Sequence, residues 1–277
     1  MFNSSGKPLL MGILNITPDS FSDGGRFNNI TSALTQVEKM LSDGADIIDI
    51  GGESTRPYSL SVSSGEQVQR VIPIIKEIRS QLSTTLQISI DTQLSTVAKL
   101  ALSEGANIIN DISAGHNDPN ILKVAANYNC PMILMHIKGT PQTMQDNPAY
   151  DNVVSDVLTS LQTSVDYAKR AGIKQDKIIL DPGIGFGKTY AHNLKLLGQL
   201  NRFVELGYPI MLGTSRKKFL NTITATKKPE DLAIATSVTT ALAVMAGVKI
   251  LRVHDVKENR QALDVAWAIK QASIDAK

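Results

Sequence analysis

The feature that most restricts the fold of this chain is a unit that recurs about eight times: a short apolar run, a loop rich in Gly, Pro, Asp or Asn, and a segment with helical periodicity. Apolar runs of this kind are typical of strands buried on both faces, as in parallel sheets. The sequence therefore predicts strands at Leu9–Leu14, Ile47–Ile50, Gln87–Ile90, Asn107–Ile109, Met132–Met135, Lys177–Leu180, Ile210–Leu212 and Ile250–Val253.

Helices are expected between these strands, and glycines mark where several of them end. The clearest helical segments are Ser32–Leu41, Gly65–Gln81, Val153–Arg170 and Asn193–Leu206. A glycine in the left-handed conformation often follows a helix, and this conformation is expected at Gly44, Gly105, Gly172, Gly207 and Gly247. Strands that alternate with helices pair in parallel through right-handed crossovers.

The length favours a closed barrel for these units. A (β/α)8 barrel takes roughly 250 residues, and this chain has 277 with no long linker to divide it. We therefore expect one α/β domain over residues 1–277, a TIM barrel with its active site at the C-terminal ends of the strands. A doubly wound open sheet is the structural alternative, which periodicity alone leaves open.

Composition narrows the classes of protein to which the chain can belong. The formal net charge of +2 gives no indication of binding to nucleic acid or to an anionic membrane. Cys130 is the single cysteine, so no internal disulfide can form, and the N-terminus lacks the pattern of a signal peptide. The uncharged stretch 232–248 is too short to span a membrane comfortably and is expected to be a buried helix. These features predict a cytoplasmic protein.

Polar side chains follow the predicted strands at their C-terminal ends. A single residue of this kind is more often exposed to solvent or caps the next helix. Their recurrence after all eight strands indicates instead a shared site at one face of the barrel. The residues are Asn15, the segment 53–56, Asp91, Asn110 with Asp111, His136, Asp181, the segment 214–217, Arg252 and His254 with Asp255.

The acidic and amide side chains of this set suit a flat, polar ring. Asp91, Asn110 and Asp181 offer carboxylates and an amide within apolar walls. A buried carboxylate needs hydrogen-bond donors to offset its desolvation, so a heterocycle with donors along one edge is the expected ligand.

The basic side chains predict an anion site beside that ring. Arg252 and His254 belong to the last strand and Asn15 to the first, and these two strands are neighbours once a barrel closes. The turn 215–217 adds two cations from the seventh strand. Basic groups at this part of a barrel mouth are typical of a phosphate site.

The segment 183–189 resembles two nucleotide-binding motifs and departs from each by one residue. A P-loop requires glycine where Pro182 stands, and the Rossmann fingerprint requires glycine where Lys188 stands. A flexible loop that carries Phe186 over the mouth is the better interpretation. His116 and His192 are expected in solvated loops or at helix starts, whereas His136 is equally compatible with a structural or a functional role. Cys130 stands alone, so no zinc site is expected.

With these residues in place, the chain resembles the dihydropteroate synthase family over nearly its whole length. The two longest matching segments are MGILNITPDSFSDGG at 11–25 and DIGGESTRP at 49–57. Shorter matches follow in order: SIDT at 89–92, NDIS at 110–113, MH at 135–136, DPGIGFGK at 181–188, GTSRK at 213–217 and RVHDV at 252–256.

This resemblance implies a transferase of folate biosynthesis. Such an enzyme joins 6-hydroxymethyl-7,8-dihydropterin pyrophosphate to 4-aminobenzoate, giving 7,8-dihydropteroate and pyrophosphate by an SN1-like substitution. It also implies Mg²⁺, a homodimer, and competition by sulfonamides for the aminobenzoate pocket. The alternatives are a pterin-binding barrel of the methyltransferase type, which needs no pyrophosphate pocket, and a catalytically idle pterin-binding paralogue.

The family's residue roles carry over to matching positions. The catalytic set would be Asp91, Lys217, Arg252 and His254. The pterin would contact Asp91, Asn110, Ile112, Met135, Asp181, Phe186, Gly213 and Lys217, and the pyrophosphate would contact Asn15, Arg252 and His254. Asn15 would also bind Mg²⁺. The aminobenzoate pocket and its loops would involve Thr55, Arg56, Pro57, Phe186, Lys217 and the start of the following helix, beneath loops 17–28 and 54–64.

Two positions depart from the family pattern. Glycine often follows the Thr-Arg-Pro of the second loop, where this chain has Tyr58, and a basic residue is common where it has Gln142. Both are expected on loops rather than among the ring-binding residues. The reaction is therefore expected to be retained, with substrate affinity and drug response open to change.

Overall fold

A computed structural model describes residues 6–17, 26–226 and 228–275 of the chain. Within these residues, eight parallel strands form one sheet in the order β6-β5-β4-β3-β2-β1-β8-β7. Their bounds are β1 Leu9–Asn15, β2 Ile47–Gly51, β3 Gln87–Asp91, β4 Ile108–Asp111, β5 Met132–Met135, β6 Ile178–Asp181, β7 Met211–Leu212 and β8 Ile250–Val253. Each contains or overlaps a predicted run, so the strand prediction is confirmed.

The sheet closes on itself between its two end strands. A parallel bridge pairs Leu180 of β6 with Ile210, next to β7. The Leu180 amide also donates to the carbonyl of Pro209 at 2.9 Å. This contact completes a (β/α)8 barrel and excludes the doubly wound open sheet.

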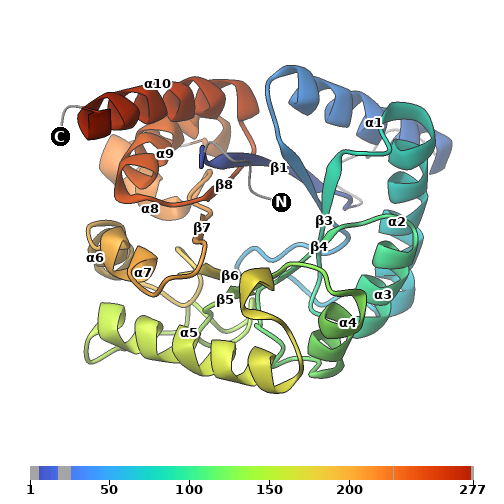
Figure 1. Cartoon of the computed structure of the whole chain (residues 1–277), viewed down its shortest axis with the longest axis horizontal. Coiled ribbons are helices and arrows are strands. Elements are labelled where there is room, and N and C mark those ends of the chain that lie inside the picture. The colour runs from blue at the N-terminus through green and yellow to red at the C-terminus, as the bar shows by residue number, and fades with distance from the viewer. Residues whose placement is uncertain (1–5, 18–25, 227, 276–277) are drawn as a thin grey trace.

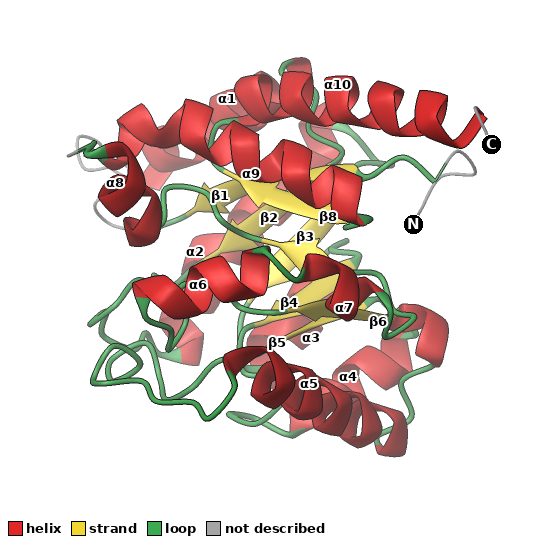
Figure 2. Cartoon of the chain, turned by 90° about the vertical axis from the view of Figure 1, so that its left-hand side faces the viewer, coloured by secondary structure: helices red, strands yellow, loops and turns green. Residues whose placement is uncertain are grey.

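Helices surround the strands as a ring, which Figure 1 shows nearly end-on and Figure 2 from the side. Parallel pairing requires each strand to be followed by a crossover, and helices provide it. The helices are α1 Arg26–Ser42, α2 Ser64–Glu77, α3 Ser95–Ser103, α4 Asn120–Tyr128, α5 Val153–Arg170, α6 Tyr190–Leu197, α7 Leu200–Val204, α8 Lys218–Thr224, α9 Ala233–Ala246 and α10 Val256–Asp275.

Two predicted helices differ from the structure. The expected helix 193–206 is two helices, α6 and α7, separated at Gly198 and Gln199. Glycine has a low helix propensity, and Gln199 leaves the helical region with φ −126° and ψ 30°. Helix α2 ends earlier than predicted, and a π-helical turn follows at Ile78–Leu82. The five predicted cap glycines all have positive φ, from 77° to 109°.

The uncharged stretch 232–248 forms α9, and the prediction of a buried helix is wrong for one of its faces. Its barrel-facing side buries small residues such as Thr236, Thr240 and Ala243. Ile234 and Leu242 face outward and are 78% and 63% exposed. No helix within the described ranges has the length and apolarity to cross a membrane.

The barrel interior changes from apolar to polar along its axis. Eight apolar side chains fill the N-terminal half: Leu9, Met11, Ile47, Ile108, Ile133, Ile179, Met211 and Ile250. Alternate strand residues point to the same side, so positions two residues further along also point inward. Several of these are polar: Asp49, Asn110, Asp181 and Arg252. Asp49, Asn110, Asp181 and Arg252 thus form a polar layer above the packed N-terminal half. We call this layer, at the C-terminal end of the barrel, the polar floor.

Candidate active site

The centre of this polar floor is Arg252, held between two carboxylates. Its Nε donates to Asp49 Oδ2 and its Nη2 to Asp91 Oδ2, both at 2.6 Å. Asp49 also accepts from Asn110 Nδ2 at 3.1 Å. Burial lowers the pKa of Arg252, but the two carboxylates outweigh burial and raise it. The predicted residues Asp91, Asn110 and Arg252 therefore meet in one network.

Asp49 is a site residue that the sequence prediction missed. It is fully buried, and its partner Arg252 was expected to contact the anion rather than a second carboxylate. The sequence did contain a signal for this residue. Alternate residues of a strand point to the same side, so Asp49, two residues after Ile47 on β2, points into the barrel interior as Ile47 does. A charged residue at an inward position of a barrel strand needs a partner.

Three buried polar atoms have no partner among the described residues: Asp49 Oδ1, Asn110 Oδ1 and Ser89 Oγ. They belong to three adjacent strands, and Asp49 is directly paired in register with Ser89. Buried acceptors without donors are rare in folded proteins and call for a water or a ligand. This part of the floor therefore fits a molecule that brings hydrogen-bond donors.

Asp181 and Lys217 provide an opposite pair of charges at the same end. Asp181 ends β6 and accepts from the Gly183 amide at 2.7 Å. Burial raises the pKa of Asp181 to about 6 and lowers the pKa of Lys217 to about 8. For Asp91, burial raises the pKa and Arg252 opposes the rise.

An apolar wall stands beside these charges. Ile112, Met135 and Phe186, all predicted site residues, pack with Met144, which the prediction did not include. Lys217 Nζ lies 4.0 Å from the centroid of the Phe186 ring, a cation–π geometry. Phe186 is 7% exposed, so it packs within the mouth rather than over it. Gly213, also predicted, leaves room for Arg252, whose Cβ would lie 3.9 Å from an added Cβ.

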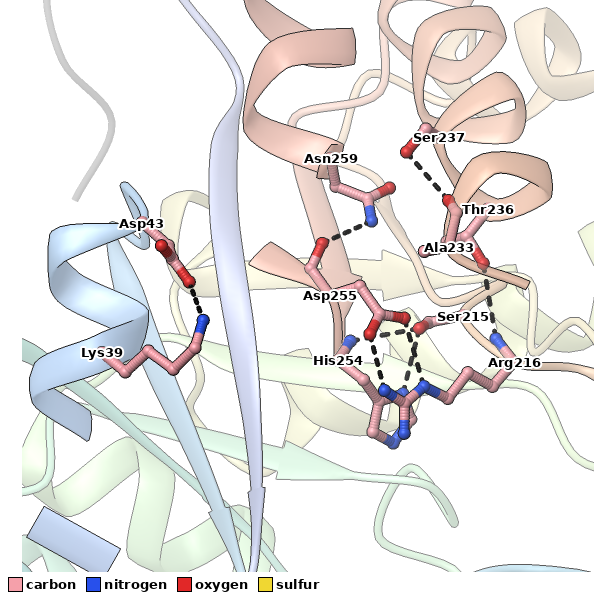
Figure 3. A network of polar contacts seen from close by, with 10 residues as sticks. All are labelled: Lys39, Asp43, Ser215, Arg216, Ala233, Thr236, Ser237, His254, Asp255 and Asn259. Atoms are coloured by element: carbon pink, nitrogen blue, oxygen red, sulfur yellow. Dashed lines mark hydrogen bonds and ion pairs between the residues drawn. The ribbon is translucent and has the colours of Figure 1, made fainter. Parts of the chain in front are cut away.

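The two cations of the predicted turn 215–217, Arg216 and Lys217, have different partners. Arg216 pairs with Asp255 through Nε at 3.1 Å and Nη2 at 2.5 Å, as Figure 3 shows. Arg216 adopts φ 58°, which turns the chain so that the next residue, Lys217, is the one beside Phe186. One cation of the predicted pair is thus committed to Asp255, and the other belongs to the site.

His254 lies beside this turn as a neutral imidazole. Ser215 Oγ accepts from the His254 amide at 3.1 Å and is 3.0 Å from His254 Nδ1, as Figure 3 also shows. Burial and then the nearby arginines and Lys217 lower the pKa of His254 to about 3. The ring therefore contributes a directed N–H rather than a positive charge.

Asn15 ends β1 in register with Gly51 of β2. A Cβ added at Gly51 would lie 3.6 Å from Asn15 Oδ1 and 3.7 Å from Asp91 Oδ2. The missing side chain leaves an amide oxygen and a carboxylate oxygen facing one space. Among the described residues no group of three or more His, Cys, Asp or Glu is placed to hold a metal ion.

The second loop lies at the rim. Thr55 is partly buried, whereas Arg56 and Pro57 are exposed. The loop is anchored below them, because Glu53 accepts from Gln67 Nε2 at 3.1 Å and the Val62 amide at 2.8 Å. Gln67 in turn accepts from Thr92, the residue after Asp91, at 2.9 Å.

Tyr58, one of the two departures from the family pattern, has φ 65° and is 65% exposed. Its amide donates to the Pro141 carbonyl at 2.9 Å, next to Gln142. Most of the predicted first loop, residues 18–25, lies outside the described residues.

The predictions for His116 and His192 are confirmed. His192 lies at a helix start, where it completes the capping box of α6. His116 is exposed and stacks on Tyr167. His136 is buried beside Lys188, a residue of the family match 181–188 to which the prediction gave no role in the site.

Comparison with known proteins agrees with this geometry. The family of pterin binding enzymes matches residues 11–254. A dihydropteroate synthase of Clostridium beijerinckii is 47% identical over 262 residues, covering 94% of each chain. A Yersinia pestis dihydropteroate synthase structure with a sulfonamide drug complex has a TM-score of 0.91 at 39% identity, covering 98% of this chain and 97% of that one. A Clostridium difficile dihydropteroate synthase in the presence of pteroic acid has a TM-score of 0.91 at 42% identity, covering 97% and 99%.

Proposed function

This chain belongs to the dihydropteroate synthase family of pterin-binding enzymes, and we propose how its site performs the family reaction. The substrates are 6-hydroxymethyl-7,8-dihydropterin pyrophosphate and 4-aminobenzoate, and the products are 7,8-dihydropteroate and pyrophosphate. The observation that carries the assignment is the buried network of Asp49, Asn110 and Arg252, in which Asp49 Oδ1 and Asn110 Oδ1 have no donor within the described ranges. A pterin presents ring N–H and amino groups along one edge, which supply the donors that these oxygens lack.

The pterin lies between the polar floor and the apolar wall. Asp181, when ionised, accepts from the ring edge, and Asn110 offers its free Oδ1. Ile112, Met135 and Phe186, which pack as one cluster, cover one face of the ring. Asp91 holds negative charge close to the methylene carbon and stabilises a cation there.

The pyrophosphate lies at the β8 and β1 side of the mouth. His254 donates from Nε2 when Ser215 donates to Nδ1. Arg252 shares its charge between Asp49 and Asp91 in the free site, and we propose that its guanidinium also contacts the pyrophosphate. Lys217 adds a positive charge that balances Asp181.

Asn15 fits the role of a magnesium ligand. Mg²⁺ prefers oxygen ligands and is usually held by one or two protein groups with substrate phosphates completing the shell. Asn15 Oδ1 faces the space above Gly51 together with a carboxylate oxygen, which is a suitable donor set. When bound, the ion would neutralise charge on the leaving pyrophosphate.

The reaction then requires little proton transfer before the methylene C–O bond breaks. The methylene C–O bond breaks, its electrons leave with pyrophosphate, and the cation is delocalised into the pterin. The neutral arylamine of 4-aminobenzoate attacks the methylene carbon and loses its proton afterwards. Thr55, Arg56 and Pro57 on the second loop border the aminobenzoate, and sulfonamides compete for that place.

We also propose that the enzyme is a cytoplasmic homodimer, as the family resemblance implied. The support is the outward face of α9, formed by Ile234, Val238 and Leu242 at four-residue spacing, which is more apolar than the face against the barrel. Helix α10 packs beside it and exposes Val265 and Ile269. A contiguous apolar face of this kind marks an interaction surface.

Product formation from the two substrates tests the function. Dihydropteroate and pyrophosphate should appear in equal amounts, and both should fall when Mg²⁺ is chelated. Asp181→Ala should abolish binding of the pterin substrate. Arg252→Ala should impair pyrophosphate binding and departure, and because it leaves Asp49 and Asp91 without their partner it should also lower the stability of the fold. Pterin binding without product would favour the idle paralogue or the methyl-transfer barrel, and normal turnover by Asp181→Ala would refute the ring-binding assignment.

A further inference from the structure

Lys188 is a buried lysine that the proposed reaction does not use. It is 2% exposed, and it lies within the segment 183–189 that departs from both nucleotide-binding motifs. Its Nζ lies 2.9 Å from His136 Nδ1, 2.9 Å from the Phe186 carbonyl and 3.3 Å from the His136 carbonyl. Burial lowers the pKa of Lys188 to about 7, and in its protonated form the amine has three hydrogens, which these three acceptors match.

The acceptor role of His136 follows from its surroundings. Burial and the positive charge of Lys188 lower the pKa of His136 to about 3. The ring is therefore neutral, and Nδ1 accepts from Lys188 when the ring proton is on Nε2. Lys188 thus joins the end of β5 to the loop that follows β6.

Three side chains hold consecutive carbonyls of this loop. Gln145 Nε2 donates to the Gly185 carbonyl at 2.8 Å, Lys188 donates to that of Phe186, and Tyr150 donates to that of Gly187 at 2.7 Å. The loop lies directly on the backbone after β5, since a Cβ at Gly183 would collide with the His136 carbonyl. The Phe186 amide donates to the Gly183 carbonyl at 3.1 Å within the loop, whereas the Lys188 contact ties the Phe186 carbonyl to the end of β5.

The position of Phe186 determines the positions of other groups in the site. Its ring lies between the apolar wall and the Lys217 ammonium, 4.0 Å from the ring centroid. The loop also touches Lys217 directly, because a Cβ at Gly185 would be 3.0 Å from Lys217 Cδ. A shift of the Phe186 peptide would therefore displace both the wall and the cation.

We propose that Lys188 is a positioning residue, which fixes the Phe186 carbonyl to the end of β5 and so sets the Phe186 ring and the Lys217 ammonium for the substrates. This proposal rests on the proposed function and deepens it. Lys188 touches neither substrate in this role. Its contribution is geometric, and misplacement of a reacting group by about 1 Å can cost on the order of 10²-fold in rate.

The test compares Lys188→Met, which keeps the length of the side chain and removes its donors, with Lys188→Arg, which keeps charge and donors. Lys195→Met, at an exposed position on α6, is the matched control. We expect kcat/KM to fall on the order of 10²-fold for Lys188→Met, with Lys188→Arg recovering part of it and the control unchanged. Wild-type turnover in the same assay tests the proposed function separately.

A double-mutant cycle separates positioning from general stability. If Lys188 acts through Phe186, adding Lys188→Met to Phe186→Ala should cost little more in kcat/KM than Phe186→Ala alone. Additive losses, or full activity of a folded Lys188→Met variant, would overturn the proposal. Should Lys188→Met fail to fold, Lys188→Gln serves in the same cycle, since its amide cannot reach all three acceptors.

Discussion

At the residue scale, Arg252 shows how this site handles a buried charge. Asp49 and Asp91 neutralise it before any substrate arrives, and Asn110 supplies a further bond to Asp49. A buried ion pair gains little net stability because both charges lose their hydration, but removing one partner alone is strongly destabilising. The main effect of this network is therefore to hold the side chains of Asp49, Asp91 and Asn110 in fixed orientations, so that their remaining oxygen atoms point toward the ligand.

The role of Asp49 can be tested by its isosteric replacement. Asp49→Asn removes the charge facing Arg252 Nε while keeping the volume of the side chain, and we expect a loss of about 3 kcal/mol in the free energy of unfolding. Urea denaturation measures it. Ser89→Ala is the control, because the Ser89 hydroxyl is buried and has no partner in the part of the chain that the structure describes, so its loss should be neutral or slightly stabilising. Equal effects of the two changes would contradict this account.

The charges of Asp181 and Lys217 predict a bell-shaped pH dependence. Asp181, with its pKa raised to about 6, gains a proton as pH falls and can then no longer accept from two ring donors. Lys217, with its pKa lowered to about 8, loses its positive charge as pH rises. Asp91, whose pKa burial raises to about 7, also loses its negative charge as pH falls. The free-enzyme parameter kcat/KM should thus fall below about pH 7 and above about pH 8.

Lys217→Arg identifies the alkaline limb of this profile. A guanidinium keeps its proton throughout the range, so any remaining activity should persist above pH 8. Lys195→Arg, on the exposed side of α6, should leave both limbs in place. An alkaline limb unchanged in Lys217→Arg would show that another group titrates there.

At the element scale, the second loop carries a strained residue. Tyr58 has φ 65°, a conformation that costs a residue with a Cβ roughly 1–2 kcal/mol and glycine little. This explains physically why glycine is favoured at a position of this kind. The loop is held by Glu53 and Gln67 on one side and by the Pro141 carbonyl on the other, which maintains the strain.

Tyr58→Gly should therefore stabilise the fold by up to about 1 kcal/mol, the relief of strain being partly offset by the greater freedom of glycine when unfolded. Thermal unfolding measures the change. Tyr58→Ala is the matched control, since it removes the ring but keeps the Cβ and the strain. The expected order of stability is Gly above Ala, and the reverse order would contradict the role assigned to the backbone.

How far the sequence predicts these elements depends on which physical signal each one leaves. Buried strands such as Met132–Met135 are visible because every residue is apolar. Asp49 was missed because a single charged residue within an apolar run carries no clear meaning until one knows which residues of the strand point into the barrel and which point toward the helices. The break at Gly198 was missed because helical periodicity continues across it. The Lys188 contacts join two loops 52 residues apart in sequence, and only the closed barrel brings such loops together.

At the scale of the whole molecule, the outer surfaces of the helices differ in polarity. Most helices place polar residues outward, but α9 has no charged residue and exposes Ile234, Val238 and Leu242, while α10 exposes Val265 and Ile269. In a single copy this surface would remain in water. Burying an exposed leucine or isoleucine contributes about 1.5–3 kcal/mol per side chain, so pairing two such faces provides a driving force for the proposed homodimer.

Leu242→Glu tests this association, since a carboxylate buried in an apolar interface would lose its hydration without a partner. We expect the wild-type chain to have the mass of a dimer by light scattering after size-exclusion chromatography, and Leu242→Glu to have that of a monomer. Leu100→Glu on α3, a leucine that is 39% exposed on a different side of the barrel, should remain dimeric. Because the site is built from the strands of one chain, the monomeric variant should still form dihydropteroate. A wild-type monomer would refute the dimer without affecting the proposed reaction, whereas loss of activity on dissociation would mean that the partner supports the site.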